Sequence, residues 1–373
     1  MNASEKLRVL TKRYPMLKRI FLHFLLILAI LLVCVSCRPI TPPSVESGNE
    51  ELVLLTQRDQ RLKVLQFTDM HFGEEGTTYH NADVKRTLAF IDYAIKTEQP
   101  DLIVLLGDNM MSQGVKGAKF LVETFDQYKI PYTLLYGNHD AETYQLNHKK
   151  SDVSRYLENC DSPYLLYKSG FVQEGKENRY GNFSISLRDE ESRELIGAFV
   201  LLDTGTYDYE ADRYQMITQE QIAWYEAEIA RLNAIYGEQS QNALGTVPTI
   251  TYGHMPLPKF GEAYQKASNN DGAEFIYYQK LSGWVLGGAN SSPEGVEDSF
   301  FDAMKKMQSA RAYICGHYHM VTCHVKMDGI ILGFCPQTGF THNSTRPCST
   351  FSYTIGADFE MDLHLVVEPQ SAD

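Results

Sequence analysis

Three short apolar segments, each followed at once by polar residues, constrain the fold of this chain more than any other feature of its sequence. The segments are Leu62–Phe67, Asp101–Leu106 and Tyr132–Tyr136, and their length and apolar character are typical of buried strands. Amphipathic stretches at 81–97 and 116–127 separate them. This order of strands and helices predicts right-handed crossovers within a parallel sheet, and so an α/β protein.

The residues that follow these segments are of the kinds that bind metal ions. They are Asp69 and His71 after the first segment, Asp108 after the second, and Asn138, His139 and Asp140 after the third. Parallel strands end at one edge of a sheet, where α/β proteins build their sites. A single Gly-Asn-His-Asp turn could be purely structural, but the repetition at three strand ends indicates a site.

Three further histidines follow apolar segments in the second half of the chain. His254 comes after Val247–Tyr252, and His317 and His319 come after Ala312–Cys315. Alternate residues of an extended segment share a side, so the last two imidazoles can face one site. Carboxylate and imidazole ligands suit first-row divalent metals, and this set is too large for one ion. Two ions about 3.5–4 Å apart, sharing a carboxylate, can hold both the attacking and the leaving oxygen of a phosphoryl group.

Taken in order, these segments resemble the five motifs of the calcineurin-like metallophosphoesterases. The motifs are Asp69-Met70-His71, Gly107-Asp108, Gly137-Asn138-His139-Asp140, Gly253-His254 and Gly316-His317-Tyr318-His319. The resemblance spans residues 62 to 319 and implies the metallophosphoesterase fold, a four-layer α-β-β-α sandwich of two mixed sheets. Leu202-Asp203-Thr204-Gly205 and His254-Met255-Pro256 are further similar to a purple-acid-phosphatase-like branch.

The resemblance also implies a role for each site residue. One divalent metal ion would be held by Asp69, His71 and His319, a second by Asn138, His254 and His317, and Asp108 would bridge the two. A metal-bridging hydroxide would attack phosphorus. His139 would stabilise the transition state and protonate the leaving group, and Asp140 would either orient His139 or hold the turn. The metals could be Mn, Fe, Zn or Co.

One position departs from the purple acid phosphatases. These enzymes carry a tyrosine three residues after the aspartate of the second motif, and this chain has Met111 there. The charge transfer from tyrosine to iron that colours those enzymes is therefore not expected, which argues against a ferric site.

We therefore predict a metal-dependent phosphoesterase that hydrolyses phosphate monoesters of small molecules at a dinuclear metal centre. A phosphodiesterase acting on a nucleotide or a lipid headgroup is the alternative, because the same centre can serve both reactions. A non-catalytic binding protein that retains the fold is a third interpretation, which the complete set of ligands opposes.

The first 37 residues differ in character from the rest of the chain. Six basic residues precede an apolar run from Ile20 to Val35, the pattern of a targeting signal. Ser36-Cys37 resembles a bacterial lipoprotein processing site with Cys37 as the lipidated residue, and an uncleaved signal anchor is the alternative. Either interpretation predicts an exported, membrane-tethered protein whose catalytic domain lies outside the cytoplasm.

Charge narrows the range of partners. The targeting segment has six basic residues and one acidic residue, Glu5, and so a net charge of +5. Because the whole chain has a net charge of −13, the residues after this segment have a net charge of −13 − 5 = −18. Such an acidic body repels a phosphate backbone, and nucleic acid is not an expected partner. Five cysteines follow the targeting segment, and Cys315 and Cys323, which flank a predicted hairpin, could pair.

The predicted organisation is a targeting segment (1–37), a linker (38–60) and one phosphoesterase domain (61–368). Residues 257–297, rich in Gly, Asn and Ser, suit a lid or a substrate-contacting loop. The segments expected to close the domain as a second, mostly antiparallel sheet are 322–326, 329–333, 351–355 and 363–367.

Overall fold

The computed structural model of the chain describes residues 43–47, 51–56, 61–73, 81–111, 114–140, 149–175, 178–239, 245–279, 299–319, 322–340, 348–356 and 359–369. The chain divides into two compact units, Met1–Thr41 and Pro42–Asp373. The second unit holds all the elements below, and the predicted targeting segment lies outside the described residues. Among the helices that are described, none has both the length and the apolar character needed to cross a membrane.

The first sheet contains the three strands that the sequence pattern predicts. β3 (Leu62–Phe67), β4 (Leu102–Leu105) and β5 (Tyr132–Leu134) pair in parallel. β6 (Leu165–Leu166) extends this parallel set, while β17 (Ser349–Ile355) pairs antiparallel with β3 and with β18 (Met361–Val367). The order β18-β17-β3-β4-β5-β6 makes a mixed, six-stranded sheet.

The second sheet has ten strands and is also mixed. Its main path is β1 (Ser44–Ser47), β2 (Leu52–Thr56), β8 (Arg179–Asp189), β9 (Leu195–Leu201), β12 (Thr249–Tyr252), β14 (Ala310–Cys315), β16 (Ile330–Phe334), β15 (Thr322–Met327) and β13 (Ala273–Gln279), with β7 (Phe171–Gln173) beside β8. β10 (Tyr207–Asp208) and β11 (Arg213–Tyr214) form a separate hairpin. The central strands β9, β12, β14 and β16 run parallel.

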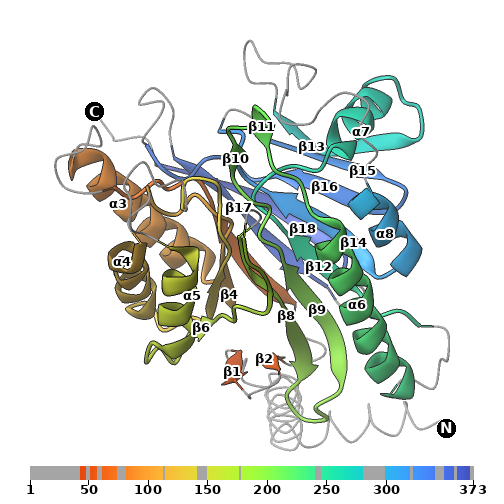
Figure 1. Cartoon of the computed structure of the whole chain (residues 1–373), viewed down its shortest axis with the longest axis horizontal. Coiled ribbons are helices and arrows are strands. Elements are labelled where there is room, and N and C mark those ends of the chain that lie inside the picture. Colours follow the sequence, from red (N-terminus) through yellow and green to blue (C-terminus); the bar gives the residue numbers. More distant parts are fainter. Residues whose placement is uncertain are drawn as a thin grey trace, which may run out of the picture. The chain divides into compact units, whose positions relative to one another are not determined.

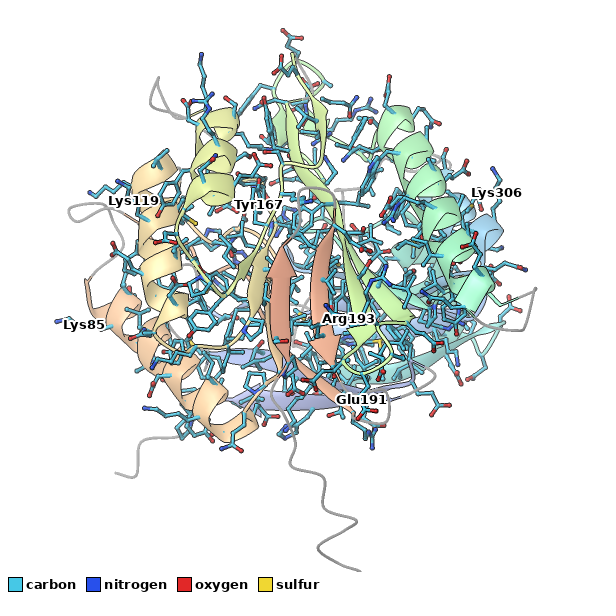
Figure 2. The ribbon with its side chains drawn as sticks, turned by 90° about the horizontal axis from the view of Figure 1, so that it is seen from below. Lys85, Lys119, Tyr167, Glu191, Arg193 and Lys306 are labelled. Atoms are coloured by element: carbon cyan, nitrogen blue, oxygen red, sulfur yellow. The ribbon has the colours of Figure 1, made fainter. Side chains whose placement is uncertain are left out.

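Helices cover the outer faces of the two sheets, which gives the predicted four layers (Figure 1). α3 (Asn81–Glu98), α4 (Gly114–Asp126) and α5 (Lys150–Asn159) lie on the side of the first sheet, and α6 (Gln219–Gln239), α7 (Lys259–Ser268) and α8 (Ser299–Met307) on the side of the second. Lys85 and Lys119 point outward from α3 and α4, and Lys306 points outward from α8 on the opposite side (Figure 2).

The sequence of α6 shows why its helix forms where it does. Thr218 Oγ1 accepts the backbone N–H of Gln221 at 3.1 Å, and the Gln221 side chain accepts the backbone N–H of Thr218 at 3.0 Å. This reciprocal pair is a capping box, which satisfies donors that a helix start leaves open. The predicted face, spaced at three and four residues, is buried against the second sheet: Ile222, Tyr225, Ile229 and Leu232.

The linker predicted for residues 38–60 is wrong for its described part. β1 and β2 lie within this range and pair with each other, and β2 also pairs in parallel with β8. Leu52, Val53, Leu54 and Leu55 are all buried. A continuous apolar run is typical of a strand that is covered on both faces. The apolar residues 52–55 therefore indicate a buried strand, although the prolines before them are typical of a linker.

Two predictions about the second half of the domain are also corrected. Residues 259–268 and 273–279 form α7 and β13, not an irregular lid; residues 280–298 lie outside the described ranges. The four closing segments divide between both sheets, because β17 and β18 join the first sheet and β15 and β16 the second. The five described cysteines, Cys315 and Cys323 included, are free thiols.

Candidate metal centre

The predicted site residues come from strand ends of both sheets. Asp69, Asp108 and Asn138 lie beyond β3, β4 and β5 of the first sheet. His254 follows β12, and His317 follows β14, its neighbour in the second sheet. His254 Nε2 lies 3.1 Å from Asp108 Oδ2, so the two sets of strand ends face the same space.

Four of the site residues have a left-handed backbone conformation. The angle φ is 52° at Asp69, 48° at His71, 48° at Asp108 and 70° at His317. Residues other than glycine seldom adopt this conformation because it crowds Cβ, and such strain is concentrated at functional sites. Backbone hydrogen bonds from Asp69 N to Gly107 O (3.1 Å) and from His71 N to Asp108 O (2.9 Å) join the loops after β3 and β4.

Two glycines allow these loops to approach each other closely. A Cβ added to Gly137 would lie 2.2 Å from the backbone nitrogen of Asp108, and one added to Gly316 would lie 2.0 Å from Thr68 Oγ1. Neither contact is possible for real atoms: the first would displace backbone, and the second would displace the Thr68 hydroxyl and the Asp69 carboxylate, whose Oδ2 lies 2.8 Å away. The glycine in each of these motifs is therefore required by packing around the site.

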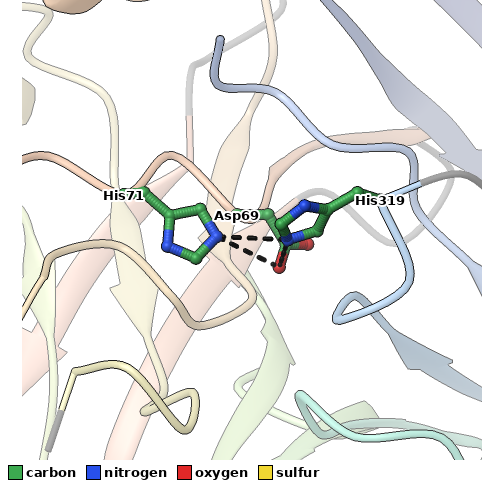
Figure 3. A group of neighbouring side chains, drawn as sticks. All are labelled: Asp69, His71 and His319. Carbon is green, nitrogen blue, oxygen red and sulfur yellow. Dashed lines mark hydrogen bonds and ion pairs between the residues drawn. The ribbon is translucent and has the colours of Figure 1, made fainter. Parts of the chain in front are cut away.

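Asp69, His71 and His319 form a first group of side chains that could hold a metal ion (Figure 3). His319 Nε2 lies 3.1 Å from His71 Nε2 and 3.2 Å from Asp69 Oδ1. His71 Nε2 lies 3.9 Å from the same carboxylate oxygen. Two imidazole nitrogens and one carboxylate oxygen thus converge, which is the arrangement of ligands around a cation.

Asp108, His254 and His317 form a second such group. His254 Nε2 lies 3.1 Å from Asp108 Oδ2, and His254 Nδ1–H donates to the carbonyl of Leu106 at 2.8 Å. A hydrogen bond of this kind fixes the ring and leaves the other nitrogen for a metal. His317 Nδ1 lies 3.0 Å from Asn138 Oδ1, which brings the predicted amide ligand to the same group.

The protonation of the site suits metal ions. Burial lowers the pKa of His71 to about 3 and, together with the charge of His254, lowers that of His317 to about 4, so both imidazoles are neutral at physiological pH. Burial alone would raise the pKa of Asp69 and Asp108, but the neighbouring histidines hold both pKa values well below the usual range. Anionic carboxylates and neutral imidazoles are the forms that bind metals.

The surroundings of two buried atoms of the site also favour a bound positive charge. Asp69 Oδ1 and His254 Nε2 are buried, and each lies next to another predicted ligand: His319 Nε2 is 3.2 Å from the former, and Asp108 Oδ2 is 3.1 Å from the latter. Although burial lowers the pKa of His254, the negative charges of Asp108 and Asp69 raise it to about 10. A proton on His254 or divalent cations can balance the two carboxylates, so the donor set fits the metal ions that the resemblance implies.

His139 and Asp140 lie beside this donor set. The backbone N–H of His139 donates to Asp108 Oδ1 at 2.7 Å. Asp140 accepts the backbone N–H of Met110 and of Gly137, both at 2.8 Å, and so ties together the loops after β4 and β5. Burial and the charge of Asp108 raise the pKa of Asp140 to about 7. These contacts give Asp140 a structural role, and its orientation of His139 stays a prediction.

The residue that departs from the purple acid phosphatases lies next to the first group. Met111 Sδ is 3.2 Å from His71 Nδ1. A thioether is a weak hydrogen-bond acceptor, and it is uncharged. A soft, neutral neighbour therefore contacts His71 at the position where those enzymes carry tyrosine.

A buried ion pair near the site has no counterpart among the sequence-based predictions. Lys150 Nζ lies 2.6 Å from Asp203 Oδ2, and both side chains are fully buried. The next residue, Thr204, accepts the backbone N–H of Met255 through Oγ1 at 3.0 Å and so supports the loop that carries His254. The position of Asp203 after an apolar segment indicates from the sequence alone that it could lie near the site. Lys150 lies in a polar helix, and no sequence pattern indicates that its side chain is buried.

Comparisons with known proteins show what this chain is similar to. A family model described as calcineurin-like phosphoesterase matches residues 62–321. An Arabidopsis thaliana protein named probable inactive purple acid phosphatase 29 is 28% identical over 260 residues, which are 64% of this chain and 64% of that protein, just under two thirds of its length. Another, named probable inactive purple acid phosphatase 14, is 22% identical over 87% of this chain and 80% of its own. Among solved structures, a dimetal phosphatase from Danio rerio matches with a TM-score of 0.46 and 10% identity over 82% of this chain and 98% of that one.

Proposed function

This chain belongs to the calcineurin-like phosphoesterase family, and we propose that it hydrolyses phosphate monoesters with two divalent metal ions. The observation that carries the proposal is the position of Asp108. Its Oδ2 lies 3.1 Å from His254 Nε2 and 3.9 Å from His71 Nε2, so one carboxylate oxygen faces ligands of both groups. A carboxylate shared between two ions has to occupy such a position.

The proposed ligands divide into two sets. Asp69, His71 and His319 would hold one ion, Asn138, His254 and His317 the other, and Asp108 both. When bound, such ions lower the pKa of a coordinated water and stabilise the charge of a phosphoryl group. Carboxylate and imidazole together suit Mn, Fe, Zn or Co. His139 would donate a hydrogen bond to the phosphoryl group and a proton to the leaving oxygen.

A non-catalytic binding protein is the second candidate function. The observation in its favour is that the two Arabidopsis relatives carry the word inactive in their names. Against it stand the two convergent ligand groups and the close approach of His139 to Asp108. A protein that had lost catalysis would be under no constraint to keep all of these side chains in one place.

The first experiment measures hydrolysis of an aryl phosphate monoester and of the matching diester by the full-length protein. We expect turnover of the monoester with Mn²⁺, and a loss on the order of a hundredfold or more after treatment with EDTA, because the ions supply several kcal/mol of transition-state stabilisation. Added metal is expected to restore the rate. Faster turnover of the diester would favour a phosphodiesterase, and two bound metals without turnover of either ester would favour the binding protein.

We further propose that the protein acts outside the cytoplasm while tethered to a membrane. The support is the basic and apolar pattern of residues 1–37. If Cys37 is the lipidated residue, its replacement by serine is expected to abolish the incorporation of labelled fatty acid; if an uncleaved anchor holds the protein, neither labelling nor membrane association is expected to depend on Cys37. A wild-type protein found entirely in the soluble cytoplasmic fraction would contradict both forms of the tether.

A further inference from the structure

A row of tyrosine rings leads from the metal centre toward solvent. Tyr214 lies edge-on to His317, with ring centroids 4.7 Å apart. The Tyr214 ring is 5.1 Å from that of Tyr207, and Tyr207 is 5.0 Å from Tyr209. All three contacts have T-shaped geometry, the favourable arrangement for aromatic pairs. We refer to Tyr207, Tyr209 and Tyr214 as the tyrosine row.

The tyrosine row is carried by the hairpin of β10 and β11, drawn in green near the top of Figure 1. Tyr207 and Tyr214 are direct partners across its two strands. Side chains at such positions lie on the same face of a hairpin, which explains why the two rings touch. The remaining ring, Tyr209, lies in the turn and is 66% exposed, the largest exposed fraction among the exposed large apolar side chains of the described residues.

The base of the hairpin is held firmly to the body of the domain. The backbone N–H of Gln215 donates to the carbonyl of Thr206 at 3.0 Å, and the backbone N–H of Thr206 donates to Gln215 Oε1 at 3.1 Å. Arg179, which is fully buried, donates to the carbonyl of Met216 at 3.0 Å. The first two contacts close the base of the hairpin, and the third joins it to the body of the domain at Met216.

The polar groups of the hairpin are engaged locally. Tyr207 donates its hydroxyl hydrogen to Asp212 at 2.6 Å. Asp208 accepts the backbone N–H groups of Glu210 and Ala211 at 3.0 and 3.1 Å. Asp208 and Asp212 therefore shape the turn itself. The hairpin then offers a ligand its aromatic rings, beside the exposed side chains of Glu210 and Arg213.

We propose that the tyrosine row binds the alcohol portion of the substrate and selects phosphate esters whose alcohol carries a planar aromatic ring. The inference rests on the proposed function. With phosphorus at the metal centre, His317 marks one end of the row, and the alcohol of the ester extends away from phosphorus along it. A nucleobase or a phenyl ring can stack on an exposed tyrosine through its π face, whereas a sugar or an alkyl chain can offer only its C–H groups to the ring.

The test compares the full-length wild-type protein with Tyr209→Ala, Tyr209→Phe and Tyr93→Ala. Tyr93 is an exposed tyrosine on α3, which lies on the side of the first sheet and apart from the hairpin (Figure 1), and it serves as the matched control. Two substrate pairs are used: adenosine monophosphate with ribose phosphate, and phenyl phosphate with ethyl phosphate. The measured quantity is the ratio of kcat/KM within each pair, so differences in leaving-group chemistry cancel between proteins.

We expect Tyr209→Ala to lower the ratio about tenfold, or about 1.4 kcal/mol, the lower part of the range for loss of one stacking contact. The phenylalanine variant and the control are expected to keep the wild-type ratio. A change confined to the first pair identifies a nucleobase as the bound ring, and a change confined to the second identifies a phenyl group. Unchanged ratios in both pairs overturn the inference while leaving the proposed function intact, and no turnover of any ester by the wild-type protein overturns both.

Discussion

Replacement of Asp108 by asparagine is expected to abolish metal-dependent hydrolysis, with a loss of kcat/KM on the order of a thousandfold or more. The carboxylate faces His71 on one side and His254 on the other. Asparagine keeps the shape of the side chain and an oxygen for the backbone N–H of His139, but it removes the negative charge. The loss should therefore come from metal binding and not from misfolding.

The measurement pairs steady-state kinetics with the metal content per chain. Asp92→Asn is the matched control, because Asp92 lies on the exposed face of α3 in an ion pair with Lys96, and pairs of this kind contribute little to stability. The control is expected to behave as the wild type does. If Asp108→Asn retained both its metal content and a rate within tenfold of the wild type, Asp108 would not be the shared ligand.

Replacement of His139 by alanine is expected to lower kcat by roughly a hundredfold to ten-thousandfold while the metal content stays constant, because a positioned proton donor contributes that much to hydrolysis. The backbone N–H that donates to Asp108 is retained in the variant. The outcome separates two roles, since His139 also lies close enough to His71 and Asp108 to complete a third possible ligand group.

The control for this variant is His364→Ala, since His364 is an exposed histidine on β18 that pairs with Glu98. Loss of bound metal together with activity in His139→Ala would make His139 a ligand, contrary to the role that we propose. A rate equal to that of the wild type would remove His139 from the mechanism altogether. The proposed role requires both a slow variant and an unchanged metal content.

Sequence reasoning succeeded where structure depends on neighbours along the chain. The strand β3 has the bounds that the apolar run predicts, and α6 begins after Thr218 because of a capping box between residues three apart. The position of the predicted site residues at strand ends follows from the general rule for parallel sheets, while their roles stay predictions. Because sites form at the carboxyl ends of such strands, the nine predicted site residues all lie in loops that follow strands.

The errors concern contacts between segments that are distant in sequence. Nothing in the sequence of β17 shows that it pairs with β3, almost 300 residues earlier, and not with the second sheet. The same holds for β2. It lies in the segment predicted to be a linker, but it pairs with β8 and so belongs to the second sheet. The contact of Tyr214 with His317 likewise depends on where a hairpin projects in space, and that direction is set by tertiary structure, which strand and helix patterns do not encode.

The division of the proposed ligands between two sheets has a consequence for how the protein matures. Asp69, Asp108 and Asn138 arrive with one sheet, and His254 and His317 with the other. A half-folded chain with only one sheet in place would present a partial donor set, with too few ligands to retain two ions. The complete donor set would thus arise only when both sheets are in place, so an unfinished chain would lack the proposed dinuclear site.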